Sequence, residues 1–124
     1  MSAQPLDELG KILMKRARDA AIAQWDKHLD GRMKGESAPI VRGILAGFSA
    51  AQMDGLRRIL PAVVDTTLHF VLWAIEQERI LDLTVKTAGG ETVSAKTASD
   101  GLPGELYGPT GWIARFSQHG HELL

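Results

Sequence analysis

Ionisable side chains recur along one side of the segment 50–78. Asp65 and His69 stand one helical turn apart, and Arg58 and Glu76 fall within about 40° of them on a helical projection. An aspartate that orients and charges a histidine is the arrangement of a general base. The candidate catalytic residues are therefore Asp65, His69 and Glu76. No serine or cysteine nucleophile can be assigned to His69, and we favour the alternative that these side chains form the outward, solvated side of the main helix.

A second candidate site lies in the glycine-rich segment Ser99–Gly120, SDGLPGELYGPTGWIARFSQHG. Its leucines and aromatic residues carry too much apolar surface for a disordered tail, so we expect an ordered, packed loop. Ordered loops display binding groups, and tyrosine, tryptophan and arginine are enriched at binding hot spots. The candidate binding residues in this loop are Asp100, Glu105, Tyr107, Trp112 and Arg115.

A structural role for the same loop is the interpretation that we favour. Trp112 and Phe116 are four residues apart, so they would pin a last turn or helix onto the core. Arg115 would then pair with Glu105 or Asp100.

Metal and cofactor sites are not expected. His119 and His121 flank Gly120 and precede Glu122, but zinc sites usually gather further ligands from ordered elements. The glycines of the C-terminal loop match neither a phosphate-binding loop nor a dinucleotide fingerprint. The sequence has no cysteine, which excludes disulfides and thiolate ligands. We therefore predict no metal and no cofactor.

Length and charge restrict the cellular setting and the partners. A chain of 124 residues predicts a single domain spanning 1–124. The net charge of −1 argues against nucleic acid, whose phosphate backbone needs an excess of lysine and arginine. The N-terminus lacks the order of a secretion signal, and no apolar run of about 18 residues suggests a membrane span. We expect a cytoplasmic protein that contacts neither nucleic acid nor membrane.

Prolines and capping residues predict the helices. Ser37 can cap a short helix, and Ser49 with Gln52 has the spacing of a capping box, which starts a further helix at Ala50. Pro61 interrupts that helix, so we expect a kink or a fresh start there. The expected helices run from about Pro5 to Leu29, from Ala38 to about Gly47, and from Ala50 to about Gln77 or Glu78.

The third of these helices is expected to be the buried centre of the core, because residues 62–77 are apolar round most of the circumference. In the short helix, the expected buried side chains are Ile40, Ile44 and Leu45. On the first helix the apolar side shifts along its length. Either that helix is wedged between neighbours of its own domain, which we favour, or its Trp25 side meets another chain.

Residues 80–98 change to an alternating pattern, which predicts a β-hairpin that turns at Gly89 and Gly90. A three-residue loop, Ala88–Gly90, keeps the apolar side chains on one face, whereas a two-residue loop mixes the faces. The expected cross-strand pairs are Leu83 with Ala95, Val85 with Val93 and, on the wet face, Asp82 with Lys96.

These elements predict an α+β domain that is mainly helical. It has three to four helices, including a long N-terminal helix and a Pro61-kinked central helix, followed by a β-hairpin and a packed C-terminal loop or short helix. The segment Asp100–Ser117, DGLPGELYGPTGWIARFS, follows WAIEQE and ILDLTV. It resembles a DGLxGELYGxxGWIxRFS signature in a small family of uncharacterised bacterial proteins. The resemblance covers roughly the last 75 residues and implies a compact bacterial domain, mostly helical with a small sheet; it carries over no catalytic residue.

The absence of a diagnostic catalytic motif favours a non-enzymatic protein-interaction domain, of an immunity or adaptor kind, whose acidic or aromatic surface caps a partner. Trp25 and the aromatic residues of the C-terminal loop motivate this interpretation. A homo-oligomer is a second expectation about partners. The alternatives are a small-molecule binding module, with a pocket between the central helix and the C-terminal loop, and an enzyme that uses Asp65, His69 and Glu76.

Overall fold

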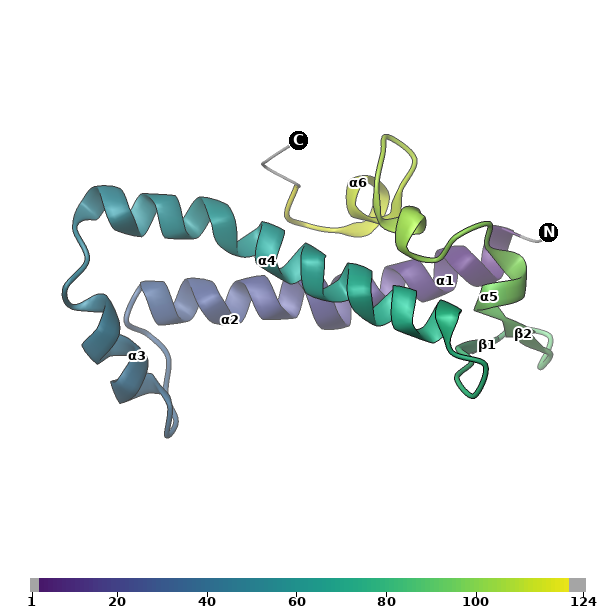
Figure 1. The fold of residues 1–124 in the computed structure, drawn as a ribbon, viewed down its shortest axis with the longest axis horizontal. Coiled ribbons are helices and arrows are strands. Elements are labelled where there is room, and N and C mark those ends of the chain that lie inside the picture. The colour runs from purple at the N-terminus through teal and green to yellow at the C-terminus, as the bar shows by residue number, and fades with distance from the viewer. Residues whose placement is uncertain (1–2, 121–124) are drawn as a thin grey trace.

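Two long helical rods lie side by side and antiparallel, and they form the frame of the molecule (Figure 1). The computed structural model describes residues 3–120. The first rod comprises α1 (Ala3–Leu13), the π-helical segment η1 (Met14–Asp19) and α2 (Ala20–Leu29), and the second is α4 (Ala50–Gln77). The expected N-terminal helix is confirmed, with a π-helical segment that the sequence pattern did not predict.

Local signals set the ends of both rods as predicted. The first ends at Leu29, and Gly31 follows it with a φ of +73°, a conformation that favours glycine. At the start of α4, Ser49 Oγ accepts a hydrogen bond from the Gln52 N–H at 3.1 Å, and Gln52 Oε1 accepts one from the Ser49 N–H at 2.7 Å. This capping box satisfies two free backbone donors and confirms where the helix begins.

The short helix α3 (Ala38–Leu45) packs against α2 near the end of the frame. It begins where expected, but Ser37 makes no side-chain cap hydrogen bond there. Ala38 is buried, whereas Ile40 and Ile44 are 67% and 63% exposed. The expected buried side of this helix is therefore wrong, because within residues 3–120 no second layer covers the isoleucines.

Pro61 lies inside α4 and does not end it. A proline in a helix interior lacks the N–H that would bond four residues back, so it bends a helix even where the helix continues. Figure 1 shows the axis of α4 changing direction along its length. The structure thus has one bent helix and no fresh start at Pro61.

α4 is not the buried centre of the fold. Its fully buried residues are Pro61, Asp65 and Leu72, which share one side of the helix. That side packs against the first rod and the C-terminal segment. The expectation of a helix buried all round is wrong because the rest of the described chain supplies a covering layer on one side.

The β-hairpin has the predicted register. It consists of β1 (Thr84–Lys86) and β2 (Thr92–Ser94), and it pairs Val85 with Val93. The Ala95 N–H also donates to the Leu83 carbonyl at 2.8 Å. Gly90 has a φ of +86° in the loop, as a three-residue connection of this kind requires.

The predicted ion pair across the hairpin, Asp82 with Lys96, is wrong. After Ser94 the chain turns into the short helix α5 (Ala95–Ala98), which carries Lys96 away from the strand. Asp82 Oδ1 instead accepts from Ser94 Oγ at 2.8 Å, and Lys96 Nζ donates to the Glu78 carbonyl at 2.7 Å.

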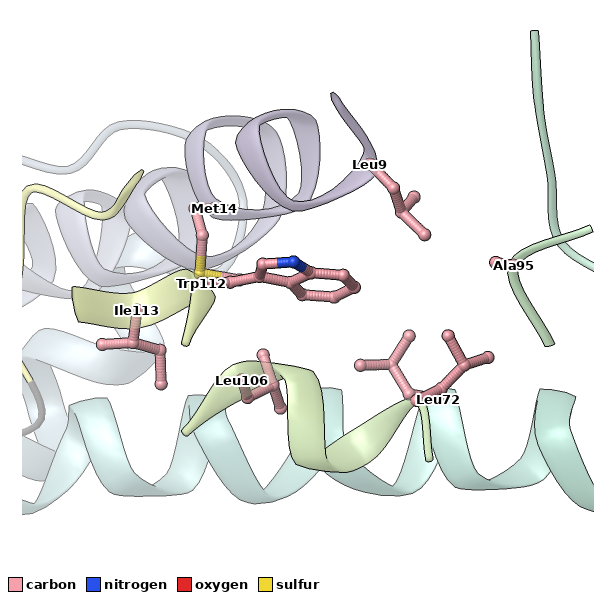
Figure 2. Packing of buried hydrophobic residues seen from close by; sticks show 8 residues of the cluster. Leu9, Met14, Leu72, Ala95, Leu106, Trp112 and Ile113 are labelled. Carbon is pink, nitrogen blue, oxygen red and sulfur yellow. The ribbon is translucent and has the colours of Figure 1, made fainter. Parts of the chain in front are cut away.

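The core lies at one end of the frame, where α1, α4 and the C-terminal segment meet (Figure 2). That segment contains the 3-10 turn η2 (Pro103–Leu106) and α6 (Trp112–Phe116). Trp112 is 1% exposed, and its indole lies so close to Gly10 that a Cβ at Gly10 would collide with it. The buried apolar cluster comprises Leu9, Met14, Leu72, Ala95, Leu102, Leu106, Trp112 and Ile113.

The fold is a mainly helical α+β architecture with a two-stranded antiparallel hairpin, as predicted. The short helices α5 and α6 raise the number of helices above the expected three to four.

Candidate functional site

A buried ion pair joins the two rods at their middle. Arg18, from η1, has no exposed surface, and Asp65, from α4, is 1% exposed. Arg18 Nε donates to Asp65 Oδ1 at 2.6 Å and Nη2 donates to Oδ2 at 3.1 Å. This two-pronged geometry is the strong form of an arginine–carboxylate contact.

The same arginine holds the end of the described chain. Its Nη1 donates to Ser117 Oγ at 2.7 Å and to the His119 carbonyl, and Nη2 donates to the Gly120 carbonyl at 3.2 Å. With the two bonds to Asp65, all five N–H donors of the guanidinium have acceptors. Asp19, also on η1, accepts from Ser117 Oγ and from the Gln118 N–H. The π-helical segment therefore anchors the C-terminal segment to the frame.

His69 faces the C-terminal segment rather than open solvent. Its Nδ1 lies 3.1 Å from Tyr107 Oη, and both side chains are half-buried. Partial burial, followed by the negative charge of Asp65, raises the pKa of Tyr107. The tyrosine is therefore a neutral hydrogen-bond partner of His69 at neutral pH.

The candidate catalytic residues are divided among different partners. The carboxylate of Asp65 is bound to Arg18, and His69 is bound to Tyr107. Glu76 Oε2 accepts from the Leu102 N–H at 2.7 Å and so fixes the start of η2. The contacts of His69 and Glu76 position the C-terminal segment against α4, and the contact of Asp65 joins the two rods, so all three residues have a structural role.

The candidate binding residues of the C-terminal loop are also spread out. Trp112 pins α6 to the core, as expected, so its indole is not accessible to a partner. Arg115 Nη2 pairs with Asp7 Oδ1 at 2.8 Å, instead of with Glu105 or Asp100, and its guanidinium lies over the Phe116 ring.

A hollow of about 300 Å³ brings several of the loop residues together. It lies between α1 and the C-terminal loop, so it does not adjoin α4 as the predicted pocket would. Burial raises the pKa of Glu105 in its wall, and the charge of Arg115 opposes that shift. Asp100 is exposed outside this hollow. The residues that line the hollow are Leu6, Asp7, Gly104, Glu105, Tyr107, Thr110, Gly111, Trp112 and Arg115.

A larger groove of about 890 Å³ runs between α1 and the β-hairpin. Leu9, Ile12 and Val85 are among the residues that line it, and Ile12 is 56% exposed. Sequence reasoning did not predict this groove, because it depends on the angle at which the hairpin leaves the frame.

Within residues 3–120, a row of exposed apolar side chains runs along the outer side of α4. Phe70 is 58% exposed and Trp73 is 48% exposed, and their rings meet edge to face at 6.3 Å between centroids. The exposed Thr66 and Thr67 donate their hydroxyls to the Ala62 and Val63 carbonyls of the same helix. We call this surface the uncharged face of α4. Its central row is Leu56, Ile59, Val63, Thr66, Phe70 and Trp73.

The charged residues of α4 are confined to the opposite half of the helix. At 3.6 residues per turn, they fall on the side that carries the buried Pro61, Asp65 and Leu72. This segregation is visible in the sequence, but the expected outward, solvated position of the Asp65 side is wrong, because that side packs against the first rod. The charged residues of α4 are Asp54, Arg57, Arg58, Asp65 and Glu76.

The Trp25 side of α2 offers less surface to a partner. Trp25 is half-buried, and its ring lies 4.9 Å from that of the buried His28.

By length and composition, α4 is the one helix within residues 3–120 that could cross a membrane, and most of it is exposed. One such helix is weak evidence for a span, because the core helix of a soluble protein satisfies the same criteria.

Within residues 3–120, no cluster of three or more histidine and acidic side chains has the geometry of a metal site. His119 belongs to this part of the chain, whereas His121 and Glu122 lie outside the described residues. The expectation about metal binding at the C-terminus therefore stays a prediction.

No protein-family model, curated protein or solved structure matches this chain. The resemblance carried by the C-terminal signature likewise stays a prediction, and function has to be argued from the geometry.

Proposed function

We propose that this chain is a non-enzymatic protein-interaction domain and that the uncharged face of α4 is its contact surface. The observation that carries the proposal is the exposure of Phe70 and Trp73 on a helix face without charges. Large contiguous apolar surfaces are uncommon on monomers and usually mark interaction sites. Aromatic side chains are also enriched at the centres of such sites.

The energetic reason is the cost of leaving this face in water. Apolar surface gains roughly 25 cal/mol per Å² when it is removed from solvent. Ile59, Val63 and Phe70 are each about half exposed or more, so a docked partner recovers stabilisation that folding of the single chain leaves unused. The polar contacts at Asp65, His69 and Glu76 support this proposal, since they hold the C-terminal segment and leave the outer side of α4 free.

Photo-cross-linking in the native cell tests the proposal. Benzoylphenylalanine placed at Phe70 should form adducts with a polypeptide. The matched control carries benzoylphenylalanine at position 80 instead, because Ile80 is 92% exposed and lies beyond the end of α4. We expect few adducts there. Adducts with lipid alone at position 70, or equal polypeptide labelling at both positions, would contradict the proposal.

A small-molecule binding module is the second candidate, and the hollow beside α1 favours it. The hollow has a volume of about 300 Å³. Arg115, Asp7 and Glu105 line it with both positive and negative charge, which suits a small polar ligand. A ligand screen by thermal shift tests this. A ligand whose effect survives Arg115→Ala would not be bound in this hollow.

A further inference from the structure

We propose that the partner on the uncharged face of α4 is a second copy of this chain, packed α4 against α4 about a two-fold axis. This inference rests on the proposed function and names its partner. Three observations carry it: the spacing of the apolar residues, the absence of charge, and the area left exposed.

The spacing is that of a helix–helix seam. Leu56, Val63 and Phe70 are seven residues apart. Three residues after each of them come Ile59, Thr66 and Trp73, so apolar or methyl-bearing side chains alternate at intervals of three and four. This is the pattern by which one helix inserts its side chains between those of a second helix with the same repeat. The seam points away from α2, and within residues 3–120 its side chains from Ile59 to Trp73 are exposed, whereas Leu56 is half-buried.

The charge distribution makes the face compatible with itself. A two-fold interface places each residue of the patch opposite a residue of the same patch in the other copy. Like charges set opposite each other would oppose such a contact. The charged side chains of α4, such as Arg58 and Glu76, lie on the other half of the helix, so two copies meet without that repulsion.

The chain also exposes more surface than a compact fold of its mass would. The chain exposes 8121 Å², whereas a compact monomer of 13.5 kDa exposes about 6,500 Å². The excess, roughly 1,600 Å² per chain, belongs to the whole surface, and it leaves room for a standard interface, in which each partner loses approximately 800 Å². Two helical pairs joined along α4 would form a four-helix arrangement, whose shallow crossing angles suit this seam.

A lipid surface fits these observations less well. Helices that lie in a membrane interface usually carry lysine and arginine on the polar half, which attracts anionic lipid. The polar half of α4 carries acids beside its arginines. It is also engaged with the rest of the fold, since Asp65 is bound to the buried Arg18.

Sedimentation equilibrium of the purified full chain tests the inference. The expected mass is twice 13.5 kDa. Phe70→Asp should raise the dimer dissociation constant at least about 100-fold, because the symmetry places the buried charge twice in a desolvated seam. Ile80→Asp is the matched control, at an exposed isoleucine outside the seam, and it should leave the dimer dissociation constant unchanged.

A second variant keeps the test decisive if the isolated Phe70→Asp chain does not fold. Because the sequence has no cysteine, Thr66→Cys introduces a single thiol at the middle of the seam. A short bismaleimide should join two otherwise unaltered chains through it, and should not join chains that carry Ile80→Cys. A dimer that is cross-linked equally at both positions, or that persists unchanged in Phe70→Asp, would overturn the proposed interface.

The failure of this inference differs from the failure of the proposed function. A measured mass that stays at 13.5 kDa up to a concentration of roughly 100 μM would overturn the proposed homodimer, because even a weak dimer is populated at that concentration. If position 70 then cross-links to a different polypeptide in the cell, the interaction domain stands with another partner. If it labels lipid alone, both proposals fail.

Discussion

Arg18 and Asp65 meet in a two-pronged ion pair that neither helix could satisfy alone. The guanidinium comes from a π-helical segment of the first rod and the carboxylate from the middle of α4. Both side chains are removed from solvent, so each depends on the other for compensation of its charge. The pair fixes the register of the two rods and, through the remaining N–H groups of Arg18, the position of the C-terminal segment.

Asp65→Asn should destabilise the fold by about 3–5 kcal/mol, because it leaves Arg18 buried without a counter-charge. The substitution keeps the shape of the side chain, so packing changes little. Urea unfolding measures the loss. The comparison is Arg57→Gln at the exposed pair with Asp30, where we expect a small change because solvent screens the contact. An Asp65→Asn midpoint equal to that of the wild type would show that the buried pair contributes no net stability.

Gly10→Ala should destabilise the protein, because the new methyl group would overlap the indole of Trp112. Overpacking of this kind in a core costs typically about 1–3 kcal/mol. Gly43→Ala is the matched change in α3, where nothing lies within 4 Å of the added Cβ. There the helix should gain roughly 0.5–1 kcal/mol from the reduced entropy of the unfolded chain. Thermal unfolding of the two variants should therefore shift in opposite directions, and equal shifts would contradict the predicted collision.

Local sequence signals were sufficient for most of the fold. The capping box at Ser49 and Gln52 set the start of α4, and the alternation around Val85 and Val93 set the hairpin register. Both depend on residues only a few positions apart, whose interaction a sequence pattern contains. The role of Asp82 was missed because the chain leaves the strand at Ala95, one residue before the expected pair.

The candidate site could be predicted less well, because it depends on which elements meet. Apolar residues all round α4 are compatible with a buried helix and with a helix that keeps one side for a partner. Only the position of α2, η1 and η2 along one side of α4 distinguishes these two possibilities. Arg18 is the most completely enclosed charge of residues 5–120. Its role follows from the long-range contact with Asp65, which no local pattern contains.

Glu105→Gln should raise the melting temperature at neutral pH. Burial raises the pKa of Glu105 above the ordinary 4.5, so the folded state holds this proton more tightly than the unfolded state does. Stability therefore falls as the pH rises from the unfolded to the folded pKa, and above both values the ionised carboxylate opposes folding. Glutamine removes this cost. The difference between variant and wild type should disappear once the pH is below 4.5, and a difference that persists there would point to packing instead.

Tyr107→Phe tests whether His69 is held by its hydrogen bond or by ring packing. The change removes the hydroxyl that lies 3.1 Å from His69 Nδ1 and keeps the aromatic ring in the wall of the hollow. A hydrogen bond of this kind contributes about 0.5–1.5 kcal/mol, and water can partly replace it at a half-buried site. A double-mutant cycle with His69→Phe should give a coupling energy in that range. Zero coupling would mean that the contact between His69 and Tyr107 contributes nothing to docking of the C-terminal segment, which the contacts of Arg18, Asp19 and Glu76 would then hold on the frame.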